Sequence, residues 1–433
     1  MRPVRWPDPS AVFAVRAARM FDGFELHTGH PLVFVKKSRI VGIDKSGAHP
    51  ATEVPVVDLG DATLLPGLID THVHLAFDPE VSAKQEIVTD SDATIVRRMR
   101  RHAGQHLMAG VTTVRDLGDR GYLSLDVRDS AGQAPGLYPE ILCAGPPITR
   151  HGGHCWFLGG EADGADAVRK AVAHRVARGV DTVKIMATGG AITPGWRPDE
   201  SQYNAEELRC AAEAAHRSGV PITAHAHGPQ GIADAVAGGT DGVEHCSFFT
   251  RDGIEPDWEL VDAMAEVGTY VGATEAWLPE GKMLAPHLAQ RLEQRTQTFA
   301  RMHRAGVRLV CCSDAGAGPR KPHGVLPHGI VHLGANGWAN VEALRSVTTL
   351  AAEACALADR KGRIAVGHDA DLLAVAGNPL ERLTDMFRVS AVWRGGTPVD
   401  LRTVGSLERR TGTGGSMVEG LGVRDLHMPA EWA

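Results

Sequence analysis

Residues 66–75 read PGLIDTHVHL, and this segment sets the architecture expected for the whole chain. A short apolar run leads into Asp70, His72 and His74, as a buried strand does when its carboxyl end reaches a site. The two-residue spacing places both imidazoles on the same side of the strand, because side chains alternate between its faces. The two histidines can therefore share one metal ion.

Seven further apolar runs with polar or glycine-rich ends follow this segment. They cover residues 111–118, 138–145, 182–190, 221–228, 241–248, 269–277 and 308–316. Segments with helical spacing lie between them, for example residues 90–108, 163–179, 205–219 and 287–306. Strands that alternate with helices in this way predict an α/β fold, a (β/α)8 barrel of the TIM type, over residues 65–361.

The two flanks of the predicted barrel carry shorter strand patterns. Residues 1–64 contain alternating strand-like pieces, and GRIAVGHDADLLAVAGNPL at residues 362–380 resumes this pattern. We therefore expect residues 1–64 and 362–401 to build one small β-sandwich domain together. Residues 402–433 are expected to form a polar C-terminal tail, and no function is assigned to it.

Composition narrows the class of protein. The net charge of −7 and the absence of a Lys/Arg run argue against a nucleic-acid partner. The first twenty residues lack a secretory signal pattern, and no window approaches the roughly 18 consecutive apolar residues of a membrane helix. Seven cysteines without a CxxC pair favour buried, reduced thiols. We expect a cytoplasmic protein that acts on a small-molecule substrate and has no membrane partner.

Chemistry-bearing residues collect at the ends of the predicted strands, where a (β/α)8 barrel carries its site. Besides Asp70 and the histidine pair, these ends offer Lys184, His225, His245 and Asp314. Each has a structural explanation by itself: a satisfied histidine pair, a lysine that reaches solvent, an aspartate that caps a helix. Their shared location favours a site instead, and their N and O donors suit zinc and related divalent ions.

As a set, the motifs make the chain resemble a known family over about residues 10–400. They are PGLIDTHVHL, VTTVRDLG, GGH at 152–154, VKIMATGG, AHAHG, VEHCS, SDAG and the return segment at 362–380. The family is the amidohydrolase superfamily, and the chain is most similar to its binuclear prolidase-like and imidazolonepropionase-like members. The resemblance also suggests a homo-oligomer.

The resemblance implies a site with two divalent metal ions, for which zinc is the expected element. His72 and His74 would bind the more buried ion with Asp314, and His225 and His245 would bind the second. Lys184 would be carboxylated and bridge both ions. Carboxylation would answer the physical objection to a buried ammonium group, because it replaces the cation with an anionic oxygen ligand.

The expected reaction is cleavage of an amide bond in a dipeptide or an N-acyl amino acid. A metal-bridging hydroxide would attack, and Asp314 would accept the water's proton and pass one to the leaving amine. The resemblance implies substrate contacts from His154 and Tyr203, with fixing of the loops as the alternative role. His227 is expected to support the ligands from outside the metal shell. Weaker candidates for a pocket lie in the same loops, at Arg150, His151, Trp196 and Arg197.

Other functions stay open. The same site could open a cyclic amide, as imidazolonepropionase does. Deamination of a heterocycle is less expected, since deaminase relatives usually lack the strand lysine, and a catalytically silent scaffold would have lost ligands that are present here. One departure from the family bears on the substrate: GPRKPHGVLPHGIVHL at residues 318–333 lacks the glutamate that often follows the last strand in relatives.

Overall fold

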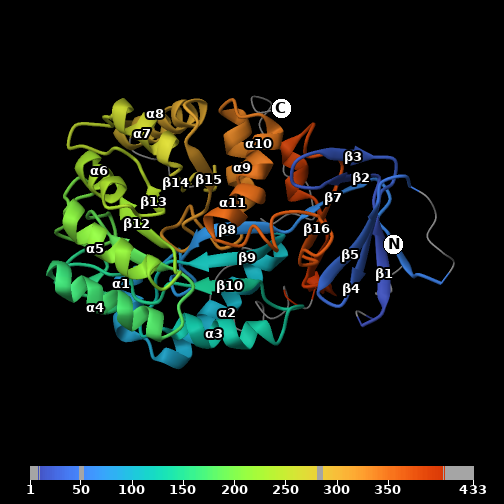
Figure 1. The fold of residues 1–433 in the computed structure, drawn as a ribbon, viewed down its shortest axis with the longest axis horizontal. Coiled ribbons are helices and arrows are strands. Elements are labelled where there is room, and N and C mark those ends of the chain that lie inside the picture. Colours follow the sequence, from blue (N-terminus) through green and yellow to red (C-terminus); the bar gives the residue numbers. More distant parts are fainter. Residues whose placement is uncertain (1–7, 9, 48–52, 280–285, 403, 405–433) are drawn as a thin grey trace.

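The computed structural model describes residues 8, 10–47, 53–279, 286–402 and 404, which form an α/β fold (Figure 1). All eight strands predicted for the central part are present, and helices separate them. They are β8 (Leu68–Val73), β9 (Val111–Asp116), β10 (Glu140–Cys143), β11 (Val183–Met186), β12 (Ile222–Ala226), β13 (Gly242–His245), β14 (Tyr270–Ala273) and β15 (Arg308–Cys311). The tail predicted at 402–433 lies outside the described residues, apart from positions 402 and 404.

The helices begin and end at the signals that the sequence carries. Ser91 caps the longest fully described helix through its hydroxyl, Asn204 and Glu207 form a capping box, and Gly268 ends a helix at φ 76°. The helices are α1 (Ala83–Thr89), α2 (Asp92–Met108), α3 (Leu123–Gly132), α4 (Gly164–Ala177), α5 (Ala205–His216), α6 (Pro229–Ala237), α7 (Trp258–Val267), α8 (Pro286–Arg304), α9 (Leu326–Ala335), α10 (Asn340–Arg345) and α11 (Thr349–Ala354). None of the described helices is long and apolar enough to cross a membrane.

The eight strands form two parallel sheets, β10-β9-β8 and β11-β12-β13-β14-β15. Each junction between these sheets is crossed by an isolated parallel bridge, Val73 with Ala315 and Ile148 with Ile185. Two prolines precede Ile148, and because proline has no N–H to donate, it interrupts a ladder at this point. One continuous closed sheet, as the predicted barrel requires, is not found in the described residues.

The two junctions lie beside the expected metal ligands. Ile148 donates its N–H to the Lys184 carbonyl oxygen over 2.8 Å. At the other junction, the backbone N–H of Asp314 donates to the His72 carbonyl oxygen over 2.7 Å. The backbone N–H of His74 donates to the Ala315 carbonyl oxygen over 3.0 Å. The sheets therefore leave their regular pairing where the candidate site begins.

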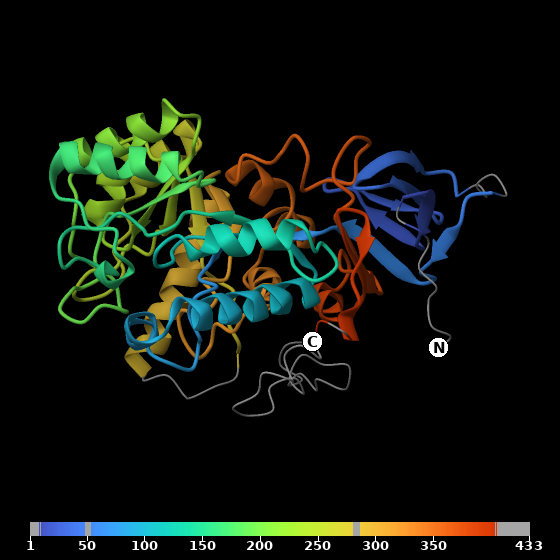
Figure 2. The ribbon, with the colours of Figure 1, turned by 90° about the horizontal axis from the view of Figure 1, so that it is seen from below.

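Two mixed sheets, one of four strands and one of six, lie together at one end of the molecule (Figure 2). One has the order β5-β4-β1-β6, with β1 (Val12–Arg16), β4 (Leu32–Lys36), β5 (Arg39–Asp44) and β6 (Val56–Asp58). The other has the order β18-β17-β16-β7-β2-β3, with β2 (Arg19–Phe21), β3 (Leu26–Thr28), β7 (Ala62–Pro66), β16 (Leu372–Ala376), β17 (Val389–Arg394) and β18 (Thr397–Pro398). Phe13 and Val33 of the first sheet share a hydrophobic cluster with Leu64, Leu372 and Trp393 of the second. Both ends of the chain therefore contribute to one core.

Candidate metal centre

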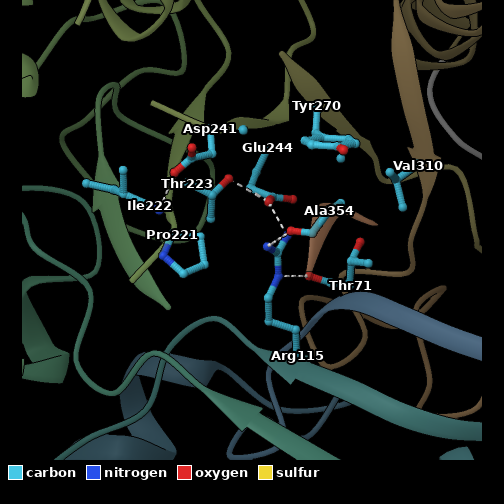
Figure 3. Close-up of a pocket in the computed structure, with 12 residues that line it drawn as sticks. Thr71, Arg115, Pro221, Ile222, Thr223, Asp241, Glu244, Tyr270, Val310 and Ala354 are labelled. Atoms are coloured by element: carbon cyan, nitrogen blue, oxygen red, sulfur yellow. Dashed lines mark hydrogen bonds and ion pairs between the residues drawn. The ribbon is translucent and has the colours of Figure 1, made fainter. Parts of the chain in front are cut away.

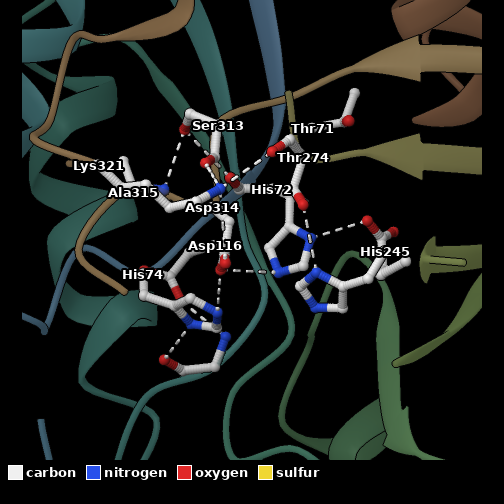
Figure 4. Close-up of polar contacts among 12 residues, drawn as sticks. Thr71, His72, His74, Asp116, His245, Thr274, Ser313, Asp314, Ala315 and Lys321 are labelled. Carbon is white, nitrogen blue, oxygen red and sulfur yellow. Dashed lines mark hydrogen bonds and ion pairs between the residues drawn. The ribbon is translucent and has the colours of Figure 1, made fainter. Parts of the chain in front are cut away.

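His72, His74 and Asp314 converge at the ends of β8 and β15 (Figure 4). The Nε2 atoms of the two histidines lie 3.5 and 3.4 Å from the same Asp314 oxygen, Oδ1. Both imidazoles are buried, and Nε2 of His72 has no hydrogen-bond partner among the described residues. Two imidazole nitrogens and a carboxylate oxygen thus form a group that could hold a metal ion.

Glu244 pairs with both His72 and Arg115 in the interior, and Figure 3 shows the contact between Glu244 and Arg115. Nδ1 of His72 lies 2.8 Å from Oε2 of Glu244. The other oxygen of Glu244 accepts hydrogen bonds from Arg115 over 2.8 Å and from Thr223 over 2.7 Å. Although burial raises the pKa of the Glu244 carboxyl, the charges of His72 and Arg115 bring it far below its usual value. The ionised carboxylate holds the proton of His72 on Nδ1 and leaves Nε2 free to bind a metal.

Glu244 and Arg115 are functional candidates that the sequence analysis did not single out. Both had a detectable signal, because a charged residue stands inside each of the apolar runs VTTVRDLG and DGVEHCSF. Their partner could not be read from the chain, since 129 positions separate the two residues.

His225, His227 and His245 form a second group that could hold a metal ion. Their ring centroids lie 4.5 to 4.7 Å apart in pairs. Burial lowers the pKa of all three imidazoles, that of His227 to about 3, so they are neutral and can act as ligands. The expected ligands His225 and His245 are therefore close together, and His227, expected outside the metal shell, lies as near to them as they lie to each other.

Lys184 connects the two groups. Its side chain is buried, and Nζ has no hydrogen-bond partner among the described residues. Its positive charge lowers the pKa of His72 in the first group and of His225 and His245 in the second. Burial lowers the pKa of its own amine to about 8. The charges of Glu244 and Asp314 act on this amine, but neither carboxylate accepts a hydrogen bond from it, which is an unfavourable arrangement for a buried ammonium group.

The two histidine groups lie side by side, because the rings of His72 and His245 are 4.9 Å apart. His245 and Asp314 both have left-handed backbone, with φ of 68° and 55°. This conformation costs a residue other than glycine about 1–3 kcal/mol and is found mainly where a site requires it. Asp70 of β8, the other polar residue singled out in this segment, lies outside both groups, and its Oδ1 accepts the Ser313 N–H over 3.0 Å. It joins β8 to the segment after β15.

Comparison with known proteins agrees with this geometry. Residues 63–399 match the Amidohydrolase family. The chain belongs to that family. It is therefore a hydrolase that acts on carbon–nitrogen bonds.

Two curated amidohydrolases and one solved structure illustrate the relationship. Ochratoxinase of Aspergillus niger is 26% identical over 372 residues, which cover 77% of this chain and 75% of that protein. Imidazolonepropionase of Saccharopolyspora erythraea is 26% identical over 278 residues, 58% of this chain and 66% of that protein. The crystal structure of a Xaa-Pro dipeptidase with bound methionine in the active site is 27% identical. It has a TM-score of 0.80 and covers 90% of this chain and 99% of its own.

The two expected substrate contacts of this amidohydrolase differ in their surroundings. The ring of His154 lies 4.7 Å from that of His225, and its buried Nδ1 has no partner among the described residues. The Tyr203 hydroxyl donates to the Ala162 carbonyl oxygen over 2.7 Å, and the Arg150 guanidinium lies over its ring. His154 thus adjoins the histidine groups, whereas Tyr203 has the contacts expected of a loop-fixing residue. Their contact with substrate stays a prediction.

The weaker pocket candidates also have partners within their loops. His151 and Arg150 pair with acidic side chains, Trp196 donates to a carbonyl, and Arg197 pairs with Asp199.

All seven cysteines are free and buried, which confirms the expectation of reduced thiols. Burial raises the thiol pKa of Cys311 and Cys312 well above the usual value, so neither is a nucleophile at neutral pH.

Proposed function

We propose that this amidohydrolase is metal-dependent and cleaves the linear amide bond of a dipeptide or an N-acyl amino acid. The observation that carries the proposal is the buried, unpartnered amine of Lys184 between two groups of metal-binding side chains. The Xaa-Pro dipeptidase and ochratoxinase relatives support an amide substrate.

The described residues fit two divalent ions, and zinc suits their mixture of imidazole and carboxylate donors. His72, His74 and Asp314 would hold one ion, and His225 and His245 the other. Carbon dioxide would add to the neutral amine of Lys184, with a new N–C bond and release of a proton, and the carbamate would bind both ions. The lowered amine pKa of about 8 favours this addition, because more of the amine is neutral near pH 7. When bound, such ions lower the pKa of water and polarise a carbonyl.

Asp314 is the residue that we propose moves the proton. Its carboxylate accepts a proton from the attacking water, whose oxygen bonds to the amide carbon. The C–N bond then breaks, its electron pair stays on nitrogen, and Asp314 returns the proton to that nitrogen. Burial raises the pKa of the Asp314 carboxyl, but contact with His74 and the charges of His72 and Lys321 lower it overall, so the carboxylate starts in the ionised form.

A cyclic amide is the second candidate substrate, because imidazolonepropionase is also a relative. Ring opening yields one product and linear cleavage yields two, so product analysis separates the alternatives.

We further propose that the eight strands act as one closed barrel and that the two mixed sheets form a sandwich. The bridges at both junctions and the shared hydrophobic cluster support this arrangement. The seven free cysteines support a cytoplasmic location.

The proposal is tested with the purified full chain, incubated with bicarbonate and two equivalents of zinc or manganese. We expect hydrolysis of at least one member of a dipeptide and N-acyl amino acid panel, and loss of activity after chelation. Lys184→Ala should bind fewer than two ions, whereas Lys170→Ala, the same change at the exposed Lys170 on α4, should bind both. Failure of the wild type to cleave any member, or two tightly bound ions in Lys184→Ala, would overturn the proposal.

A further inference from the structure

Lys321 lies in the segment after β15 that departs from the family pattern, and its side chain reaches the candidate metal centre. Its Nζ donates to the Ser313 carbonyl oxygen over 2.8 Å and to the Thr274 carbonyl oxygen over 3.1 Å. These carbonyls follow β15 and β14, so the ammonium group joins the ends of two neighbouring strands. A lysine ammonium has three hydrogens, and these bonds use two of them.

The remaining side of the ammonium group faces Asp314 (Figure 4). Nζ of Lys321 lies 3.9 Å from Oδ2 of Asp314, too far for a hydrogen bond. The other oxygen, Oδ1, is the one that faces His72 and His74. The two oxygens of this carboxylate therefore have different neighbours, the imidazoles on one and a cation on the other.

Glu275, another buried carboxylate whose charge acts on Lys321, already has a cationic partner. Glu275 is fully buried and pairs with Arg295 of α8 over 2.7 Å, and it accepts a hydrogen bond from Thr296 over 2.9 Å. Arg295 also lies 3.5 Å from the Thr274 carbonyl oxygen that Lys321 uses. Two cations thus approach one carbonyl, and both oxygens of Glu275 already have partners, since Oε1 pairs with Arg295 and Oε2 lies 3.2 Å from His332 Nε2. If Asp314 binds metal, Lys321 keeps a largely buried charge without a carboxylate of its own among the described residues, which is unfavourable unless a ligand supplies one.

We infer that Lys321 binds the free carboxylate of the amino acid released by the reaction and so makes the enzyme selective for substrates that carry it. The inference rests on the proposed function, in which Asp314 returns a proton to the leaving nitrogen. In an α-amino acid the carboxylate carbon lies about 2.5 Å from that nitrogen, through N–Cα and Cα–C bonds of about 1.5 Å. A nitrogen placed at Oδ2 of Asp314 therefore brings its carboxylate within reach of the free side of Lys321.

The test compares substrates that differ only in the carboxylate. N-acetyl-L-methionine, N-acetyl-L-phenylalanine and N-acetyl-L-leucine are each paired with the N-acetyl amine that lacks the carboxyl group. The metal-loaded full chain is assayed as wild type, Lys321→Met, Lys321→Arg and the surface control Lys170→Met. Removal of one charge-assisted contact should raise KM for the acids about 10- to 100-fold in Lys321→Met. The loss in kcat/KM for the matching neutral amides should be at least about tenfold smaller than the loss for the acids, and Lys321→Arg should retain part of the preference.

A binding measurement separates this inference from the proposed function. Calorimetry with L-methionine and L-phenylalanine, against the corresponding amines without the carboxyl group, needs no turnover. Lys321→Met should lose affinity for the amino acids by about the factor seen in KM and keep its affinity for the amines. Metal content and thermal unfolding show whether the variant is intact.

Each outcome decides a different claim. If the wild type cleaves amides but Lys321→Met affects acids and neutral amides equally, Lys321 only positions Asp314 and the inference is wrong. Unchanged selectivity in Lys321→Met also overturns it. If the wild type cleaves neither kind of substrate, the proposed function fails, and calorimetry still decides whether Lys321 binds an amino acid carboxylate.

Discussion

The candidate metal centre can be compared with a second cluster of buried histidines, which does not form a group of metal-binding side chains among the described residues. The second histidine cluster consists of His102 and His106 of α2 and His323 of the loop after β15. Burial lowers the pKa of its three imidazoles, as it lowers that of His72. Burial and the number of histidines therefore do not distinguish the two.

The difference lies in what the ring nitrogens contact. Within the second histidine cluster, His106 Nε2 lies 3.1 Å from His323 Nδ1, and His323 Nε2 lies 3.0 Å from the Phe77 carbonyl oxygen. His102 Nδ1 lies 2.8 Å from the Leu75 carbonyl oxygen. One nitrogen of this cluster, His106 Nδ1, is also without a hydrogen-bond partner among the described residues and lies 3.8 Å from Oδ2 of Asp70. In the described part of the chain no third donor joins that pair, whereas His72, His74 and Asp314 converge as a group of three. Convergence of at least three ligand atoms, rather than histidine density or one unpaired nitrogen, indicates a metal site.

The sharpest contrast is expected between Asp314 and His323. Asp314→Asn should lower kcat by about 100- to 10,000-fold, because the amide cannot accept and return the proton. His323→Phe, a change of similar burial outside the metal centre, should leave kcat within about twofold. Steady-state kinetics with metal analysis of both variants checks this, and a loss of less than tenfold in Asp314→Asn would remove Asp314 from the proton transfer.

A smaller effect is expected from a change at Glu244, which contacts His72 of the candidate metal centre. Glu244→Gln should weaken metal binding by about 10- to 100-fold, because the neutral amide no longer fixes the proton of His72 on Nδ1. Competition with a chelator of known affinity measures the change. The matched change Glu207→Gln, in the capping box of α5, should leave metal affinity unaltered. Equal affinities in the two variants would show that Glu244 does not orient His72.

Variants of His225 and His227 test which of these two residues binds the second metal ion. His225→Ala should lose the second ion, whereas His227→Ala should retain both ions and lose less than about tenfold in activity, since we expect His227 outside the metal shell. Metal counting on both variants decides the matter. Loss of an ion from His227→Ala alone would exchange the roles of the two residues, and their nearly equal distances to His245 make that outcome measurable.

The smallest effect concerns stability in acid. Burial lowers the pKa of His323 to about 4, whereas an unfolded histidine titrates near 6.5. Between these values the unfolded chain binds more protons than the folded chain, so stability falls as the pH drops from about 6.5 to about 4, by up to about 3 kcal/mol from this residue. His323→Phe should flatten this part of the pH profile of urea unfolding. An unchanged slope would show that His323 is not held neutral.

Much of the candidate site could be predicted from the sequence because its residues follow local rules. The expected ligands other than Lys184 stand at or near the end of a short apolar run, and the carboxyl ends of parallel strands meet at one edge. Lys184 stands inside its run, where a charged residue needs an explanation. Glu244 and Arg115 carried a weaker signal, since a charge inside an apolar run shows that a partner exists but not which one. The contact of the Tyr203 hydroxyl with Ala162 left no signal, because a buried hydroxyl can meet any carbonyl that packing brings near it.

The sequence alone determined the eight strands, the order in which they alternate with helices, and the positions from His72 to Asp314 that carry the chemistry. Periodicity and strand-end polarity are properties of neighbouring residues, so they can be read along the chain. Only the tertiary structure decided that the strands pair as two sheets, that His227 joins the second histidine group, and that Lys321 reaches Asp314. These outcomes depend on side-chain directions and on distances between segments far apart in the chain, which local patterns do not specify.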